Sequence, residues 1–475
     1  MSNLLASIRT AGDTLRTYEK GLTVTQNNIA NASTPGYARA GMSLIAEYFD
    51  PDHGTIGGVG TAPIQSARSS LAERAVRRQL EGLGYASTQT QLLEGIEAAF
   101  PVSSGSGIPG ALNDLLASFS SWSLTPNDSN ARAAVLEDAR GLARAFGDTA
   151  TQLSEASRTA EATLNDTVSH INALVGQLRD TNTAIRNGGR DDAGLEALAH
   201  STMEKLSELV DFTALEQADG TFTILAGGMV PLVIGDQEYP LSVDFAQPED
   251  PAWPEGPNPA RVLDAAGEDV TARIKGGTLG GTLDVRNRVL PGLIGSSSET
   301  GGVNRLAVAI AERVNGLLAA GMTEDDATPA EPLFQFDALN QTAAAITLTV
   351  NELFEPEMLA AIDPGPPYVS NGTALKLAGL GMSSDPADQI DGTGFTQFYA
   401  GMAERVGRQH AEAKETVLRQ ETSVAQARAV REEISGVSLD EEAILLLEYQ
   451  RAYQAAAQLI SVLDELTETA VNLLR

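Results

Sequence analysis

The sequence contains no cysteine among its 475 residues, which excludes disulfide bonds and thiolate metal sites. It also contains no apolar run long enough to span a membrane. The first residues do not resemble a cleaved secretory signal, because Arg9 and Asp13 interrupt the apolar segment. Aromatic residues are scarce at 5%, whereas glycine is abundant with 45 residues, which favours helix-rich packing and many turns. Composition alone therefore favours a soluble cytoplasmic protein without membrane insertion.

Basic residues are strongly outnumbered, with 32 Lys+Arg against 63 Asp+Glu and a net charge of −31 at pH 7. A polyanion is repelled by phosphate backbones and by anionic lipid headgroups, so we expect no nucleic-acid partner. The charge is uneven along the chain, because residues 1–40 carry more basic than acidic side chains, whereas residues 437–475 are strongly acidic. We therefore expect the two ends of the chain to attract each other.

Catalytic motifs are missing as well, since the chain has neither a Walker loop nor a G-x-S-x-G elbow. The stretch GSGIPG at residues 105–110 fits G-x-G-x-x-G, but a helical pattern precedes it and Pro109 disrupts the turn that would face a phosphate. The histidines lack metal-ligand spacing, and His410 lies on the seam of a predicted helix. The acidic residues are scattered rather than paired. We predict that the protein is not an enzyme and needs no cofactor or metal.

The N-terminal segment has the spacing of a coiled-coil helix, with apolar residues recurring every seven positions. This helix must end near residue 32 or 33, because Thr34 precedes a proline and Gly36 supplies a positive φ for a turn. We predict an assembly helix for contacts with other subunits, followed by a joint to a body that folds by itself. The assembly residues are Ile8, Leu15, Leu22, Asn28, Ile29 and Asn31, and the joint residues are Pro35, Gly36, Tyr37 and Arg39.

The C-terminal segment predicts a second assembly helix. Gly436 ends the preceding helix, and Ser438 with Glu441 fits a capping box. Apolar residues then follow a four-three alternation, and a second apolar stripe lies beside the first, so the apolar face is wider than one partner helix can cover. The predicted assembly residues are Ser438, Leu439, Glu441, Leu445, Tyr449, Tyr453, Leu459, Ile460, Leu463 and Leu466.

The middle of the chain predicts two further regions. Helical patterns cover residues 70–97, a segment starting at Pro109, residues 128–186 with a heptad seam, and a long segment from about residue 393. Short runs such as TFTIL, VPLVI and AITLTV after about residue 211 predict strands, interrupted by a helix around residues 303–318. We predict an α+β multidomain fold: a terminal coiled-coil pair (1–36 plus 437–475), an elongated helical bundle (37–210 plus 391–436) and an inserted β-rich outer domain (211–390).

Isolated helices are marginally stable, and most helical stability in proteins comes from packing an amphipathic face. We therefore hypothesise that both ends are largely disordered in the monomer and become helical when neighbouring subunits cover the second apolar stripe. The alternative is that the two ends are simply two helices of one self-contained bundle.

Two motifs resemble those of the bacterial flagellar axial proteins. NNIANASTPGYAR at residues 27–39 is similar to the N-terminal motif of rod, hook and hook-associated proteins, and GVSLDEEAILLLEYQRAYQAAAQLI at residues 436–460 resembles their C-terminal motif in the form of the hook–filament junction proteins. Residues 111–146 and 276–291 also resemble segments of that family.

The resemblance implies terminal helices in an inner layer around an axial channel, a helical domain outside it and a β-rich domain outermost. It implies that the protein is exported by the flagellar type III apparatus without a cleaved signal and is located outside the cell, in the flagellum. This location replaces the cytoplasmic one that composition alone favours. The implied partners are further copies in a ring, the hook protein, a second junction protein and an export chaperone on the C-terminal helix.

These motifs suggest roles for the joint residues. Amide side chains such as Asn28 can cap backbone groups at the helix end or cross to a neighbour without burying a charge, and Tyr37 and Arg39 are candidate docking residues. Each residue taken singly is also explained by a helix stop. The leading interpretation is a structural subunit of the hook–filament junction. The alternatives are a hook or distal-rod protein, or, from another class, a secreted acidic adhesin or wall-degrading enzyme.

Overall fold

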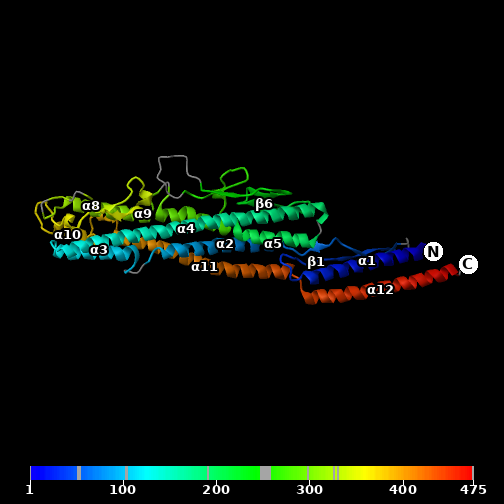
Figure 1. The fold of residues 1–475 in the computed structure, drawn as a ribbon. Helices are drawn as coiled ribbons and strands as arrows, with labels where there is room; N and C mark the ends of the chain where they lie inside the picture. The colour runs from blue at the N-terminus through cyan, green and yellow to red at the C-terminus, as the bar shows by residue number, and fades with distance from the viewer. Residues whose placement is uncertain are drawn as a thin grey trace.

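The computed structural model describes residues 2–50, 55–101, 105–189, 192–245, 258–296, 299–324, 327–328 and 331–472. These residues form an elongated molecule with a thick helical body and a narrower rod, and both ends of the chain lie at the free end of the rod (Figure 1). None of the helices in these ranges combines the length and the apolar character that crossing a membrane requires.

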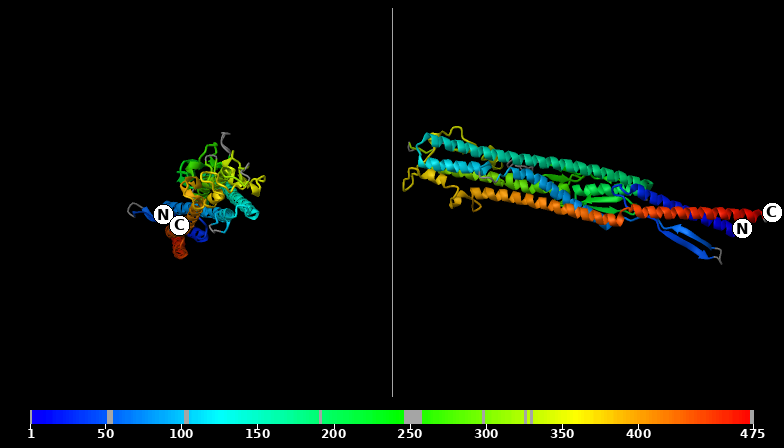
Figure 2. Two further views of the ribbon diagram at one scale, coloured as in Figure 1. Left: turned by 90° about the vertical axis from the view of Figure 1, so that its left-hand side faces the viewer. Right: turned by 90° about the horizontal axis from the view of Figure 1, so that it is seen from below.

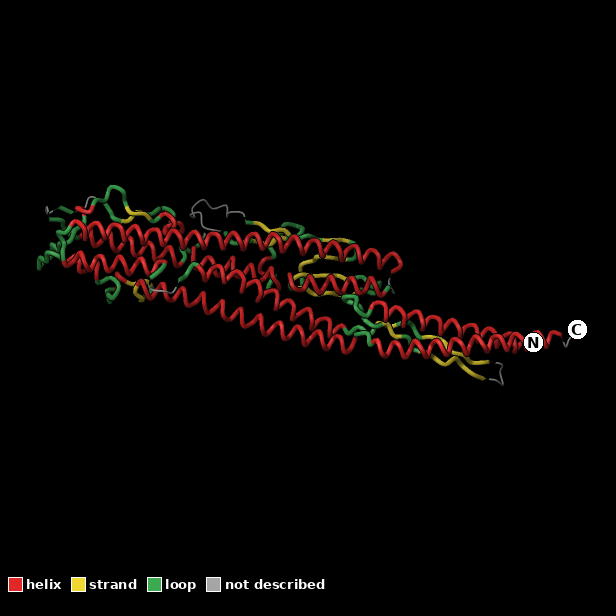
Figure 3. The backbone as a smooth tube through the Cα atoms, turned by 60° about the horizontal axis from the view of Figure 1, so that its bottom comes forward, coloured by secondary structure: helices red, strands yellow, loops and turns green. Residues whose placement is uncertain are grey.

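The rod contains the two ends of the chain. Helix α1 (Ser2–Asn31) packs against α12 (Leu439–Asn472), and the two run antiparallel because they meet at the joint and share the free end (Figures 1 and 3). A hairpin of β2 (Leu44–Asp50) and β3 (Thr55–Thr61) lies along α1 and extends toward the free end of the rod (Figure 2). The short pair β1 (Ala40–Gly41) and β4 (Gln65–Ser66) closes its base. Both terminal helices begin and end close to the predicted residues.

The body is built along one long helix, α4 (Ser129–Ala184), which continues into a π-helical turn at Ile185–Gly189. Its start is set by Asp128, whose side chain accepts a hydrogen bond from the backbone N–H of Asn130. Its end is set by Gly188, which adopts φ 115°. Beside it lie α2 (Ser70–Ala98), α3 (Gly107–Leu124) and α5 (Ala193–Leu209), and α11 (Phe395–Ser435) pairs with α2.

The described residues of the body form two large hydrophobic cores and a small cluster of Val76, Leu80 and Val424 between α2 and α11. The main core lies at the end remote from the rod and includes Phe119, Trp122, Phe146, Leu306 and Met402. The second core lies where a four-stranded antiparallel sheet packs on the C-terminal half of α4. The sheet order is β5 (Phe212–Glu216), β6 (Phe222–Ala226), β7 (Val230–Ile234) and β8 (Gln237–Glu238), followed by the pair β9 (Ser242–Asp244) and β10 (Arg261–Leu263). The heptad residues on this side are all buried: Leu164, Ile171 and Leu178 in α4, and Ile185 in the turn that follows it.

One polar side chain fixes how the sheet sits on α4. Asn182 is buried, and its Nδ2 donates to the carbonyls of Phe222 and Gly235 at 2.8 Å each, while its Oδ1 accepts from the Phe222 N–H at 2.8 Å. The amide therefore satisfies three backbone groups that burial would otherwise leave unpaired.

Strands are concentrated before residue 264, and residues 277–390 hold mostly short helices and loops. These helices are α6 (Gly277–Asp284), α7 (Leu290–Ile294), α8 (Gly302–Ala320), α9 (Ala344–Thr347) and α10 (Gly372–Ala378). Two-residue strands pair as β11 (Phe334–Gln335) with β12 (Thr349–Val350) and β13 (Gln389–Ile390) with β14 (Thr393–Gly394). Residues of α8 and α10 share the main core with α3 and α4. The predicted domain boundaries stay predictions.

The run AITLTV shows why short apolar runs are ambiguous. It was expected to form one strand, but its first residues form α9, and only Thr349 and Val350 pair with another strand. Ala345 packs into the main core from a helical turn. A run of this length cannot by itself distinguish a buried helical turn from a buried strand.

We expect Phe146→Ala to lower the free energy of unfolding by about 3–5 kcal/mol, because it empties a fully buried position in the main core. Leu124→Ala is the matched control, since Leu124 is 80% exposed at the end of α3 and its truncation should change stability by less than about 0.5 kcal/mol. Denaturant unfolding measures both changes. Equal losses in the two variants would contradict this assignment of the core.

Candidate functional site

The contact between α1 and α12 is close at its centre. The rings of Tyr18 and Tyr449 lie 6.5 Å apart between centroids, and Gly21 faces the Tyr449 ring, which would lie 3.0 Å from a Cβ at that position. Of the predicted assembly residues, the following are partly buried in the rod: Ile8, Leu15, Leu22, Ile29, Leu445, Tyr449, Tyr453, Ile460 and Leu463.

The apolar face of α12 is only partly covered. Leu459 and Leu466 are 53% and 51% exposed although α1 is in place. Val462 is exposed between them, and Ile444 is exposed nearer the start of α12. A strict seven-residue repeat drifts by about 20° per heptad on a straight α-helix, so one straight partner helix cannot cover such a stripe along its whole length. We call Ile444, Leu459, Val462 and Leu466 the outer flank of α12. Leu439, at the start of the helix, is also exposed.

Asn28 links the end of α1 to the chain that leaves it. Its Nδ2 donates to the Ala40 carbonyl at 2.9 Å, and its Oδ1 accepts from the Ala40 N–H at 2.9 Å and from the Tyr37 hydroxyl at 2.9 Å. Burial, followed by the nearby carboxylates of Glu442 and Glu196, raises the pKa of Tyr37, so its hydroxyl stays protonated as a donor. Asn28 of α1 therefore binds both Tyr37 of the predicted joint and the backbone of Ala40.

Glu442 joins the two terminal helices. Its side chain is only 1% exposed. Its Oε1 accepts a hydrogen bond from Arg39 Nε at 2.7 Å, and its Oε2 accepts one from Asn28 Nδ2 at 3.1 Å. Ser438 caps α12 as predicted, since its Oγ accepts from the Glu441 N–H at 3.4 Å. The Glu441 carboxylate lies 3.4 Å from Arg39 Nη1. Glu442 was missed from the sequence, because in an acidic first turn no local signal separates it from its neighbours.

The remaining joint residues shape the turn. Gly36 adopts φ 78°, and a Cβ there would lie 2.4 Å from the Ala197 carbonyl of α5. Asn31 Nδ2 donates to the Asn27 carbonyl at 3.0 Å, which secures the last turn of α1, whereas Pro35 is exposed. The close approach of Gly36 to α5 is thus a direct contact between the rod and the body.

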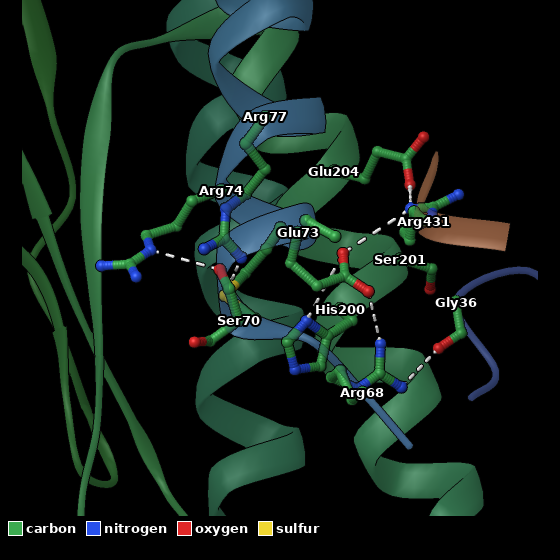
Figure 4. Close-up of polar contacts among 12 residues, drawn as sticks. Gly36, Arg68, Ser70, Glu73, Arg74, Arg77, His200, Ser201, Glu204 and Arg431 are labelled. Carbon is green, nitrogen blue, oxygen red and sulfur yellow. Dashed lines mark hydrogen bonds and ion pairs between the residues drawn. The ribbon is translucent and has the colours of Figure 1, made fainter. Parts of the chain in front are cut away.

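A buried ion-pair cluster lies next to the contact between Gly36 and α5 (Figure 4). Arg68 donates through Nη2 to the Gly36 carbonyl at 2.7 Å, through Nη1 to Glu73 at 2.7 Å and through Nε to Glu196 at 2.6 Å. Arg431, near the end of α11, lies 3.6 Å from the second oxygen of Glu73. The cluster thus links the joint to α2, α5 and α11.

A third acidic residue, Glu204, completes the cluster. Arg431 Nη1 bonds Glu204 at 2.6 Å, and Arg428 Nη2 bonds the other Glu204 oxygen at 2.6 Å. These bonds hold the pKa of Glu204 below its usual value against the opposing effect of burial. Sequence reasoning missed the cluster, because its members come from α2, α5, α11 and the segment before α2, and no local motif connects them.

His200 lies inside the cluster in its neutral form. Burial and then the charges of Arg68, Arg77 and Arg431 lower its pKa to about 2, although the Glu73 carboxylate is 4.0 Å from Nδ1. Three guanidinium groups and desolvation therefore outweigh one carboxylate that is already paired. Within the described parts of the chain, no group of three His, Asp or Glu side chains could hold a metal ion. His410, predicted to be a bundle residue, contacts Glu97 through Nδ1.

Replacing His200 should change the pH dependence of stability. In the folded protein the pKa of His200 lies well below its ordinary value of 6.5. Below about pH 6.5 the imidazole is therefore protonated in the unfolded chain but stays neutral in the folded chain, so the free energy of unfolding falls as the pH drops. Relative to His200→Gln, the wild type should lose about 1.4 kcal/mol per pH unit between pH 6 and pH 4. Denaturant unfolding across this range measures the difference, and parallel curves for the two proteins would contradict a neutral His200.

Gly36→Ala should loosen the joint, because it forces an alanine into left-handed geometry against a carbonyl. A penalty of about 1–2 kcal/mol predicts roughly tenfold faster proteolysis within residues 32–40. Gly147→Ala is the control, since nothing lies within 4 Å of a Cβ at Gly147 in α4. Cleavage at the same rate in both variants would show that Gly36 does not fix the contact between the rod and α5.

Comparison with known proteins adds independent findings. The family model described as the flagellar hook-associated protein FlgK helical domain matches residues 93–334, about half of the chain. The model described as the flagellar basal body rod FlgEFG protein C-terminal matches residues 430–473. Flagellar hook-associated protein 1 of Bacillus subtilis (strain 168) is 25% identical over 510 residues, covering 99% of both chains.

Among solved structures, the flagellar hook junction protein FlgK from Burkholderia pseudomallei superposes with a TM-score of 0.62 at 16% identity. The match covers 76% of this chain and 100% of that chain. At this identity the likeness shows a shared fold.

Proposed function

The chain belongs to the flagellar hook-associated protein FlgK family, and we propose that it is the subunit that joins the hook to the filament of a bacterial flagellum. It is a structural protein and not an enzyme. The observation that carries the proposal is the rod, which combines the two terminal motifs of the family in one helical pair and leaves an apolar flank uncovered. Copies assemble through this rod into a ring, and the body lies outside it.

The outer flank of α12 supplies the affinity in this account. Each leucine moved from water into a contact stabilises it by roughly 2 kcal/mol, and the flank offers four large aliphatic side chains. Neighbouring rods cover it, and the partly buried assembly residues between α1 and α12 hold its shape. The predicted assembly residues thus have two roles: some form the contact between α1 and α12, and others form the surface that neighbouring copies cover.

The joint transmits the position of the rod to the body. Arg39 bonds Glu442, and its backbone N–H donates to the Ser435 carbonyl at 2.9 Å, so one residue ties the end of α11 to the start of α12. A subunit between two polymers needs a defined angle at this point. We infer that Pro35, Gly36, Tyr37 and Arg39 set that angle.

The remaining proposals follow from the same arrangement. The terminal helices form the inner layer around an axial channel, and the residues of 211–390 lie outermost. The partners are further copies, the hook protein, a second junction protein and an export chaperone that covers the C-terminal helix before assembly.

The chain reaches the flagellum through the type III export apparatus. In the free monomer the rod is only weakly ordered and gains its full stability on assembly.

The nearest alternative is a hook or distal-rod protein, because a rod-protein model matches residues 430–473. The match of the FlgK helical domain to residues 93–334 favours the junction protein, since it covers the body rather than the shared terminal motif.

Leu459→Ser with Leu466→Ser should abolish assembly while leaving the body folded. Two lost leucine contacts weaken each rod interface by more than about tenfold, so cells producing this variant should secrete it and lose filaments and swimming. The control is Leu339→Ser with Met382→Ser, because both residues are almost fully exposed on the body. Swimming at the wild-type rate by the rod variant would contradict the proposal.

A further inference from the structure

The chain passes between the rod and the body through two short connections. Residues 67–69 lead from the base of the hairpin into α2, and residues 436–438 lead from α11 into α12. Ser435 holds the two connections together, because its Oγ donates to the Ala67 carbonyl at 3.1 Å and accepts from the Ser69 N–H at 3.3 Å. Two connections of three residues each, bonded side by side, have the layout of a hinge.

A cleft of about 990 Å³ lies beside these connections, between the rod and the body. Residues 16–24 of α1 form its rod wall, and its body wall is formed by the end of α4, the first turns of α5 and the strands β5 and β6. Ser66, one residue before the first connection, also lines it. Among the described residues, no hydrogen bond or ion pair joins the rod wall to the body wall. The rod is therefore held at the connections and is free of the body across the cleft.

The two walls of the cleft have opposite net charge. The charged side chains that line it in the described part of the chain are Arg16, Glu19 and Lys20 on the rod wall and Asp192, Glu196 and Glu216 on the body wall. The rod wall thus has two cations against one carboxylate, whereas the body wall has three carboxylates and no lining cation. Arg68 pairs with one of the three, Glu196, and the depressed pKa of His200 keeps that lining residue neutral, so the body wall stays net acidic.

Most of these charges are not engaged elsewhere. Lys20 and Glu216 form no ion pair with any described residue, and Arg16 reaches only Asp13, at 3.4 Å on the surface of the rod. Asp192 caps α5 through Oδ1 alone. Arg16 and Lys20 lie one helical turn apart on the same side of α1, so both can approach the body wall together.

We propose that the rod swings about the two connections and closes the cleft, so that Arg16 and Lys20 pair with Glu216 and Asp192 of the same chain. The molecule then has an open arrangement, with separate walls, and a closed one, with paired walls. Exposed ion pairs contribute little free energy each, so the two arrangements are similar in stability and both are populated. This inference rests on the proposed function for its purpose, because a subunit between two different polymers can use two rod angles.

The absence of cysteine allows the closed arrangement to be trapped by a disulfide bond. Thr23 and Ala193 are uncharged and line opposite walls of the cleft. A full-length chain with Thr23→Cys and Ala193→Cys is oxidised mildly in isolated flagella, and the intrachain disulfide is followed by mass spectrometry. It should form at least about tenfold faster than in a chain with Thr23→Cys and Ser87→Cys, because a disulfide requires Cα atoms within about 7 Å and Ser87 lies on α2 outside the cleft.

Charge variants of the double-cysteine chain test what closes the cleft. Lys20→Glu or Glu216→Lys should each slow the disulfide about fivefold through like-charge contacts, and the two together should restore the rate to within about twofold. Salt at about 1 M should also slow it, because the Debye length falls to about 3 Å. Lys205→Glu is the matched control, since Lys205 is exposed on α5 outside the cleft and its reversal should leave the rate unchanged.

Each result decides the inference. An intrachain disulfide whose rate follows these charges supports it. Absence of that disulfide, the same rate in all charge variants, or a disulfide between two chains in its place would each overturn it and leave the proposed function standing. Absence of the wild-type chain from flagella contradicts the proposed function itself, and oxidation of the purified full-length chain then decides the closure separately.

Discussion

The buried carboxylate of Glu442 is the interaction on which the shape of the molecule depends. It binds Arg39 and Asn28, residues more than 400 positions away in the sequence, so it brings the two ends of the chain together at one point. Buried ion pairs add little net stability compared with apolar contacts, but removing one partner is strongly unfavourable. The pair therefore acts mainly by selecting one geometry. Asn28 adds neutral donors and acceptors that reach Ala40 and Tyr37, which fixes the turn without a further charge.

The two parts of the molecule are stabilised differently. The body has two large hydrophobic cores and a buried ion-pair cluster around Arg68 and Glu73. In the described part of α12, by contrast, the buried residues are Ala456 and Glu442. Local stability follows buried contact, so the rod belongs to the least stable part of the structure. This contrast suits a subunit whose body is complete before assembly and whose rod is completed by its neighbours.

Much of the architecture could be predicted from the sequence, because local rules determine it. Heptad spacing located α1, α4 and α12, and Ser438 located the start of α12. Gly36 was found because its left-handed turn follows a proline. What the sequence could not show depends on distant segments. Glu442 and the cluster around Arg68 have no local signature, and the exposure of Leu459 and Leu466 depends on how α1 packs against α12. The helix α9 formed where a strand was predicted, because packing outweighed a weak β pattern.

The central claim is that the rod keeps its apolar flank for neighbouring copies and is completed by them. Amide hydrogen exchange on the dilute monomer tests this claim most directly, with α4 as the internal reference. We predict that residues 2–31 and 439–472 exchange at least about a hundredfold faster than the buried turns of α4 and slow to a similar rate in assembled flagella. Equal protection of the rod and α4 in the monomer would contradict the account.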